Sequence, residues 1–167
     1  MRLQRETDYA LRCILCLALK KTESIRANEL AHMAGAPEQM LKKLVTKLQR
    51  AGLVETRPGP GGGVSLTKQP KEISVYDVVR CIEGPLCLNQ CLGADGYCSR
   101  GGILGCGVHQ YLKEFQDEIE ASMRGMTFDK ILERNHTSAQ HANVQAAGHL
   151  CPVAAAKERY RPCTPQG

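Results

Sequence analysis

Residues 27–67 decide the fold, and they read ANELAHMAGAPEQMLKKLVTKLQRAGLVETRPGPGGGVSLT. Leu30, Ala31 and Ala34 recur at the spacing of one helix face, and Gly35 can adopt the left-handed conformation that ends a helix. Pro37 suits the first position of a following helix, which Gly52 ends. The side chains spaced for the buried side of that helix are Met40, Leu41, Leu44, Val45 and Leu48. Two short helices joined by a tight turn predict a helix-turn-helix unit.

A glycine-rich hairpin is predicted directly after this unit. Residues 53–57 and 64–67 alternate apolar and polar side chains, as strands do. The segment between them, 58–63, reads Pro-Gly-Pro-Gly-Gly-Gly and contains only turn residues. A hairpin in this position is a wing, which we expect to lie against the backbone or the minor groove of DNA.

Two flanking helices complete the predicted N-terminal domain. Apolar spacing predicts a helix over about residues 7–20, with Thr7 as its N-cap and Asp8 in its first turn. Ser74 and Asp77 form the S-x-x-D capping pattern at the start of a further helix, which Gly84 ends. We therefore expect a mainly α protein with a small β-hairpin, in which residues 1–84 form a winged helix-turn-helix domain.

The second half of the chain follows a different pattern. Residues 85–107 are rich in glycine and contain four of the nine cysteines, which predicts a loop organised by a ligand. Apolar positions spaced alternately four and three residues apart then predict a long helix that packs on another helix. These positions are Val108, Leu112, Phe115, Ile119, Ser122 and Met126. We interpret 108–134 as a dimerisation helix with a short following helix, the alternative being packing onto its own domain. The aperiodic residues 135–167 are expected to be a disordered tail.

Charge is distributed unevenly along the 167 residues. The net charge is +5, and residues 1–80 contain 14 Lys and Arg against 8 Asp and Glu, whereas residues 81–134 contain 5 against 8. A basic first half indicates a polyanionic partner. No apolar run approaches the roughly 18 residues that span a bilayer. We therefore expect a cytoplasmic protein without a membrane partner, in which thiols stay reduced.

The exposed side of the second helix of the helix-turn-helix carries residues suited to reading DNA. Gln pairs with adenine, and Lys donates to guanine or neutralises phosphate. Three lysines alone would indicate only a solvated face, but the order of helix, turn, helix and wing favours double-stranded DNA as the partner. We predict that Gln39, Lys42 and Lys43 reach base edges and that Lys47 contacts phosphate. In the wing, the residues predicted to enter the minor groove are Arg57, Pro58 and Pro60.

Four cysteines share the glycine-rich loop: Cys87, Cys91, Cys98 and Cys106. His109 follows them at the start of the long helix. Structural zinc sites usually show two short Cys-x-x-Cys pairs, which these gaps do not match. Iron–sulfur clusters bind soft thiolates and tolerate wider loops. The spacing alone thus predicts a metal site and leaves the identity of the metal open.

A combination of motifs is more specific than any one of them. It comprises Met1-Arg2-Leu3, the run from Thr7 to Arg12, Ala51 to Val54, Gly59 to Gly63, and three cysteines before a long helix. Together these motifs resemble the iron–sulfur-dependent winged-helix regulators of the IscR, NsrR and RirA type. The resemblance covers residues 1 to about 134.

The resemblance implies a homodimeric bacterial regulator of promoter DNA with a 2Fe-2S or 4Fe-4S cluster on Cys91, Cys98 and Cys106. The fourth ligand corresponds to His109 in IscR-like members and to Asp8 of the partner subunit in NsrR-like members; we prefer His109. Cys87 is an additional thiol that could replace a ligand, form a disulfide after loss of the cluster, or be a bystander. The implied signals are nitric oxide, redox state and the supply of iron.

Two other interpretations account for part of the sequence. A zinc- or thiol-based winged-helix regulator would use the same DNA-binding half. An iron–sulfur electron-transfer or carrier protein would explain the cysteines but not the wing or the lysine-rich helix. An enzyme is not expected, because the sequence shows no nucleophile beside a base, no phosphate loop and no paired acids.

Overall fold

The computed structural model describes residues 3–20, 24–59, 61–102 and 104–141. Within these ranges the chain forms six α-helices, two short 3-10 helices and one two-stranded antiparallel sheet, which confirms the predicted fold class. The α-helices are α1 (Arg5–Leu19), α2 (Ala27–Ala34), α3 (Glu38–Arg50), α4 (Val75–Glu83), α5 (Gly107–Gly125) and α6 (Phe128–His141). The strands are β1 (Val54–Arg57) and β2 (Gly63–Leu66), and the 3-10 helices are η1 (Pro70–Glu72) and η2 (Gln90–Leu92).

The helix-turn-helix forms where its local signals predict it. Gly35 ends α2 with a φ of 64°, and the N–H of Ala36 donates to the carbonyl of Ala31 at 2.9 Å. Pro37 is the N-cap of α3 rather than its first residue. Four of the five side chains expected on the buried side of α3 are buried, and Met40 is half-buried; the four are Leu41, Leu44, Val45 and Leu48.

The wing is fastened at its base to the segment that leads into α2. β1 and β2 pair in register over four residues, with Val54 opposite Leu66. Ile25 adds a bridge to Val64 through two backbone hydrogen bonds of 2.8 and 2.9 Å. This close approach requires Gly63, because a Cβ atom there would lie 2.6 Å from the carbonyl oxygen of Ile25.

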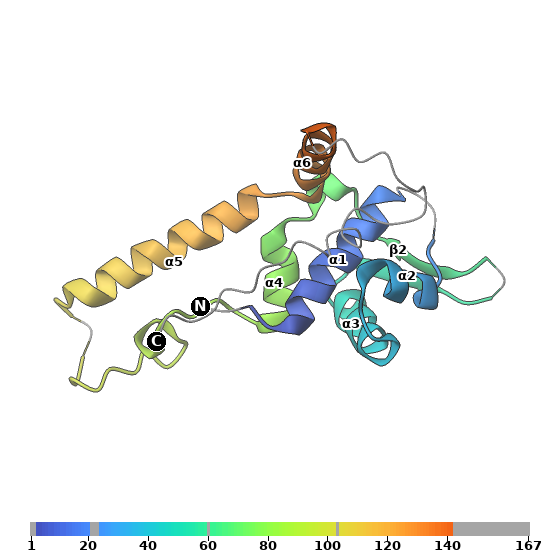
Figure 1. Ribbon diagram of the computed structural model, residues 1–167. Helices are drawn as coiled ribbons and strands as arrows, with labels where there is room; N and C mark the ends of the chain where they lie inside the picture. Colours follow the sequence, from blue (N-terminus) through green and yellow to red (C-terminus); the bar gives the residue numbers. More distant parts are fainter. Residues whose placement is uncertain (1–2, 21–23, 60, 103, 142–167) are drawn as a thin grey trace, which may run out of the picture.

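α1 is the central helix of the N-terminal domain, and it contacts α2, α3, α4 and α6 (Figure 1). The prediction that Thr7 caps this helix is wrong, because the helix begins at Arg5. Thr7 is buried instead, and its hydroxyl donates to the carboxylate of Glu83 at the end of α4. The same carboxylate accepts the backbone N–H of Gln4 at 2.8 Å. An acid 79 residues away thus satisfies the start of α1.

α4 begins with the predicted capping box. The N–H of Asp77 donates to Oγ of Ser74 at 3.2 Å, and the N–H of Ser74 donates to Oδ2 of Asp77 at 2.9 Å. The helix ends at Glu83, before Gly84, as the sequence indicates. The loop of residues 85–107 with its four cysteines, the cysteine loop, therefore starts from a well-anchored helix.

α5 projects away from the N-terminal domain (Figure 1). None of its residues is buried, while η2 of the cysteine loop contacts it. Among the described helices, none has both the length and the apolar character needed to cross a membrane.

α6 returns to the core, where Phe128 is only 1% exposed and Ile131 and Leu132 pack beside it. The helix continues to His141, so the expectation of disorder is wrong for residues 135–141. Once its first turns are anchored, each further residue of a helix costs little to add. The rest of the predicted tail, 142–167, lies outside the described residues.

Candidate nucleic-acid interface and cysteine loop

α3 presents one polar side to the outside. Because its apolar residues face the core, the side chains between them point outward. All four residues of this helix that the sequence predicts to contact DNA are exposed: Gln39, Lys42, Lys43 and Lys47. The helix follows the tight turn after α2, which is the position of a helix that enters the major groove.

The basic side chains of this surface differ in their ion pairs. Nζ of Lys47 lies 2.8 Å from Oε2 of Glu6, in the first turn of α1. Lys42 and Lys43 have no acidic oxygen within 4.0 Å in the described ranges. Sequence analysis did not identify the role of Glu6, because 41 residues separate it from Lys47.

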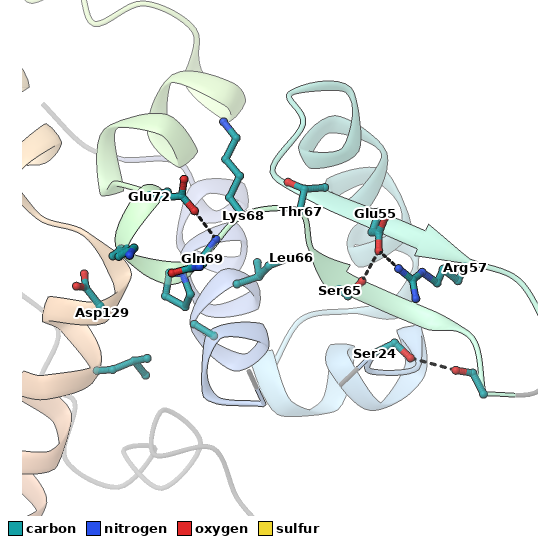
Figure 2. Close-up of a pocket in the computed structure, with 15 residues that line it drawn as sticks. Ser24, Glu55, Arg57, Ser65, Leu66, Thr67, Lys68, Gln69, Glu72 and Asp129 are labelled. Atoms are coloured by element: carbon teal, nitrogen blue, oxygen red, sulfur yellow. Dashed lines mark hydrogen bonds and ion pairs between the residues drawn. The ribbon is translucent and has the colours of Figure 1, made fainter. Parts of the chain in front are cut away.

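Arg57 of the wing is also paired, as Figure 2 shows. Its NH2 atom lies 2.7 Å from Oε1 of Glu55, and the hydroxyl of Ser65 donates to the same oxygen at 3.2 Å. Pro58 is exposed, whereas Pro60 lies outside the described residues. The sequence could have indicated the pair of Glu55 and Arg57, because residues two apart share one face of a strand.

A groove of about 900 Å³ lies beside the wing and is bordered by the segment 66–72 and the start of α6 (Figure 2). Its charged lining consists of Glu55, Arg57, Lys68, Lys71, Glu72 and Asp129. Because three acids and three bases share this lining, the groove favours no single class of charged ligand.

The first turn of α5 contacts the cysteine loop. Nδ1 of His109 lies 3.4 Å from Sγ of Cys91, and both side chains are half-buried. Two turns further along α5, Oε1 of Gln116 accepts the backbone N–H of Leu88 at 3.0 Å. Gln116 thus ties the start of the loop to the long helix, a role that no sequence motif indicated.

The remaining loop cysteines lie in separate environments. Backbone N–H groups of Arg100 and Gly102 hydrogen-bond to the sulfur of Cys98 and lower the pKa of its thiol. Cys106 is half-buried and precedes α5 as its N-cap residue. Cys87 is exposed, with its Sγ atom 3.0 Å from the carbonyl oxygen of Asn89.

The structure brings together only part of the predicted ligand set. Within the described ranges, no three Cys, His, Asp or Glu side chains are close enough to hold one metal ion. Cys91 and His109 are in contact, whereas Asp8 is exposed on α1 and pairs with Arg12 at 2.7 Å. The role of Asp8 toward a partner subunit stays a prediction.

The loop nevertheless fits an iron–sulfur cluster in its chemistry. Three thiols and one imidazole are soft or borderline donors, and the lowered pKa of Cys98 favours the thiolate that a metal requires. Burial instead raises the pKa of Cys13 to about 12, so this thiol of α1 is a core residue. Because metal binding couples to local folding, separate ligands in one glycine-rich loop are compatible with a site that closes around its cluster.

Comparisons with known proteins identify similar chains among transcriptional regulators. The model of the Rrf2 family, described as an iron-dependent transcriptional regulator, matches residues 3–134. The HTH-type transcriptional repressor NsrR of Streptomyces coelicolor is 35% identical over 129 residues, which cover 76% of this chain and 85% of that protein. The HTH-type transcriptional regulator IscR of Aliivibrio salmonicida is 27% identical over 150 residues, which cover 88% of each chain.

Two solved structures share the fold. CymR, the global cysteine regulator of B. subtilis, matches with a TM-score of 0.65 at 21% identity, over 80% of this chain and 98% of CymR. IscR of T. potens matches with a TM-score of 0.64 at 22% identity, over 89% and 94%. The family and the named relatives are regulators and not enzymes, as the sequence indicated. The match over residues 3–134 shows that this chain belongs to the Rrf2 family of DNA-binding transcriptional regulators.

Proposed function

We propose that this regulator binds promoter DNA as a homodimer and that an iron–sulfur cluster on its cysteine loop controls the strength of binding. The contact between Cys91 and His109 carries the proposal, because it joins the loop to the first turn of the longest helix described. Such a regulator acts in the cytoplasm, where promoter DNA and reduced thiols are found together.

The DNA contacts are assigned to α3 and the wing. Lys43 reads a base edge together with Gln39 and Lys42, Lys47 binds phosphate, and Arg57 enters the minor groove beside Pro58 and Pro60. Lys43→Ala should weaken binding to the operator and relax its base preference. Lys47→Ala should weaken binding to every duplex and reduce the slope of log K against log salt by about 0.9. Equal losses on all duplexes for both variants would contradict these separate roles.

The surface for a second copy of the chain is assigned to α5. Three large apolar side chains are exposed on this helix: Val108 at 66%, Tyr111 at 64% and Phe115 at 44%. The rings of Tyr111 and Phe115 stack with their centroids 6.3 Å apart. Exposed apolar side chains grouped along one helix favour a covering partner, and the seam of alternating four and three residues suits an identical helix. Phe115→Glu should produce monomers in sedimentation velocity; an unchanged dimer would refute this role of α5.

The short segment that joins α5 to α6 is hydrogen-bonded to the DNA-binding domain. The N–H of Val75 donates to the carbonyl of Met126 at 2.9 Å, and the N–H of Phe128 donates to the carbonyl of Ile73 at 3.0 Å. A ligand that favours one arrangement of the loop and α5 thereby shifts the separation of the two α3 helices in a dimer. That separation must match half-sites about 34–36 Å apart.

The residues that would hold the cluster are Cys91, Cys98 and Cys106. The fourth position would be taken by His109 of the same chain or by Asp8 of the partner subunit. When bound, a 2Fe-2S or 4Fe-4S cluster would supply iron that reacts with nitric oxide or with oxidants. A shortage of iron would also leave the cluster unformed. The chain contributes the thiolates, holds His109 beside Cys91 and anchors the loop to α5 through Gln116.

Anaerobically purified full-length protein tests the proposal. It should be brown, contain iron and sulfide, and change its affinity for promoter DNA by about 5- to 150-fold when the cluster is removed. A variant with serine at Cys91, Cys98 and Cys106 that binds the operator as the loaded protein does would overturn it. Colourless protein with stoichiometric zinc would indicate a zinc-based regulator, and coloured protein indifferent to DNA would indicate a carrier.

A thiol-based regulator is the second candidate, and Cys98 favours it. The lowered pKa of this half-buried thiol increases its thiolate fraction and its reactivity toward oxidants. Metal-free protein whose DNA affinity changes with peroxide and returns with dithiothreitol would support this candidate. The response should then be absent in Cys98→Ser.

A further inference from the structure

We infer that Glu6 and Glu55 act as internal counter-ions for Lys47 and Arg57 and so reduce the electrostatic part of the affinity for DNA. The inference rests on the proposed DNA contacts of these two cations. It adds two acidic residues as determinants of how strongly the surface attracts any duplex.

Lys47 is held by acids from another part of the fold. Its Nζ atom lies 2.8 Å from Oε2 of Glu6, which is half-buried at the start of α1. Glu83 is a second acid whose charge interacts with Lys47. The hydrogen bond from the Thr7 hydroxyl lowers the pKa of Glu83 most, and the positive charge of Lys47 lowers it further. Lys47 thus interacts with carboxylates of its own chain before any phosphate arrives.

Arg57 is held by an acid that the opposite strand keeps in place. Glu55 lies directly across the hairpin from Ser65, whose hydroxyl donates to Oε1 at 3.2 Å (Figure 2). The NH2 atom of Arg57 lies 2.7 Å from the same oxygen. Because Ser65 anchors the carboxylate on the wing, Arg57 must leave Glu55 in order to enter a minor groove.

Among the four cations assigned to DNA, ion pairs with described residues occur at Lys47 and Arg57, which are assigned to phosphate and the minor groove. Lys42 and Lys43, assigned to base edges, have no acidic partner within 4.0 Å across the described part of the chain. Binding to DNA must therefore break both ion pairs, and each exposed pair of this kind corresponds to about 1.4- to 5-fold in affinity. Once its ion pair is broken, Glu6 or Glu55 lies near DNA phosphates and keeps a salt cation beside it. The number of counterions released on binding is therefore smaller.

A double-mutant cycle in the full-length protein tests the pair on α3. With a duplex of arbitrary sequence, Glu6→Gln should tighten binding by about 1.4- to 5-fold and steepen the salt slope by up to about 0.9. In a Lys47→Met background the same substitution should give only the general effect of removing one negative charge. Glu38→Gln measures that general effect, since Glu38 is exposed in the first turn of α3 and forms no ion pair with any described residue.

The wing is tested in the same way with Glu55→Gln and Arg57→Met. Glutamine retains an oxygen that can accept the Ser65 hydroxyl, so the hairpin should keep its thermal stability, which a melting curve checks. The gain in DNA affinity from Glu55→Gln should disappear in the Arg57→Met background.

The outcomes separate the inference from the proposed function. If Lys47→Met and Arg57→Met both leave DNA binding unchanged, the assigned contacts are wrong and the inference fails with them. If these variants weaken binding but Glu6→Gln and Glu55→Gln bring no gain, the inference alone is overturned. A gain from Glu6→Gln that persists in full without Lys47, or that equals the gain from Glu38→Gln, overturns it as well.

Discussion

Nδ1 of His109 lies 3.4 Å from Sγ of Cys91, so two predicted cluster ligands 18 residues apart are in contact. One lies in the short helix η2 of the loop and the other in the first turn of α5. This contact allows the fourth ligand position to be tested directly.

His109→Ala should shorten the lifetime of the cluster in air by about tenfold or more, because it removes a donor beside Cys91. Decay of visible absorbance and iron content measure the loss, with Asp8→Ala as the matched control. A normal lifetime in His109→Ala together with rapid loss in Asp8→Ala would assign the position to Asp8 of the partner subunit.

The thiols of the metal-free protein should react in a defined order. Cys98 should be alkylated by iodoacetamide well before Cys13, because backbone N–H groups lower the pKa of Cys98 whereas burial raises that of Cys13 to about 12. Mass spectrometry of timed samples at neutral pH locates the labels. Similar labelling rates for the two cysteines would contradict the different environments.

The link between Glu83 and Thr7 should make stability depend on pH. Hydrogen bonds from Thr7 first, and from Gln4, lower the pKa of Glu83 below its ordinary value of 4.5. Its stabilisation is therefore present above pH 4.5 and is lost as the pH falls through the lower folded-state pKa.

Glu83→Gln should lower the free energy of unfolding by about 1 kcal/mol at neutral pH, a value typical of a lost helix cap and moderated here by solvent. Urea unfolding at neutral pH and at about pH 3.5 measures the effect, and the difference from native protein should shrink in acid. A difference that does not vary with pH would show that the charge of Glu83 contributes nothing.

Gly62 should be indispensable for the shape of the wing. A Cβ atom at this position would overlap the carbonyl oxygen of Arg57, and the N–H of Gly62 donates to the carbonyl of Gly59 at 2.9 Å. Gly62→Ala should cost about 1–3 kcal/mol of stability and weaken operator binding by about tenfold or more.

Gly125→Ala serves as the control for that variant. It adds the same methyl group where no atom lies within 4 Å, at the end of α5, and should leave stability equal or raise it by about 0.5–1 kcal/mol. Thermal unfolding and fluorescence anisotropy with labelled DNA compare the two. Wild-type DNA affinity in Gly62→Ala would show that the turn tolerates a side chain.

Local sequence was sufficient to predict a structural feature wherever the interacting residues are close together in the chain. Gly35 ends α2, Ser74 and Asp77 form a reciprocal cap, and the turn residues after Arg57 produce the hairpin. Each of these signals involves residues within a few positions, whose geometry the backbone fixes directly. The same logic failed at Thr7, whose pattern suits a cap but whose side chain is buried against α4.

By itself the sequence determined the helices, the wing and the sharing of one loop by four cysteines, because periodicity and turn chemistry act over short stretches of chain. Only the tertiary structure decided which polar groups meet: His109 with Cys91, Glu6 with Lys47 and Glu83 with Thr7, at separations of 18, 41 and 76 residues. Such contacts depend on how α1, α3, α4 and α5 pack in three dimensions, and no local period encodes that packing.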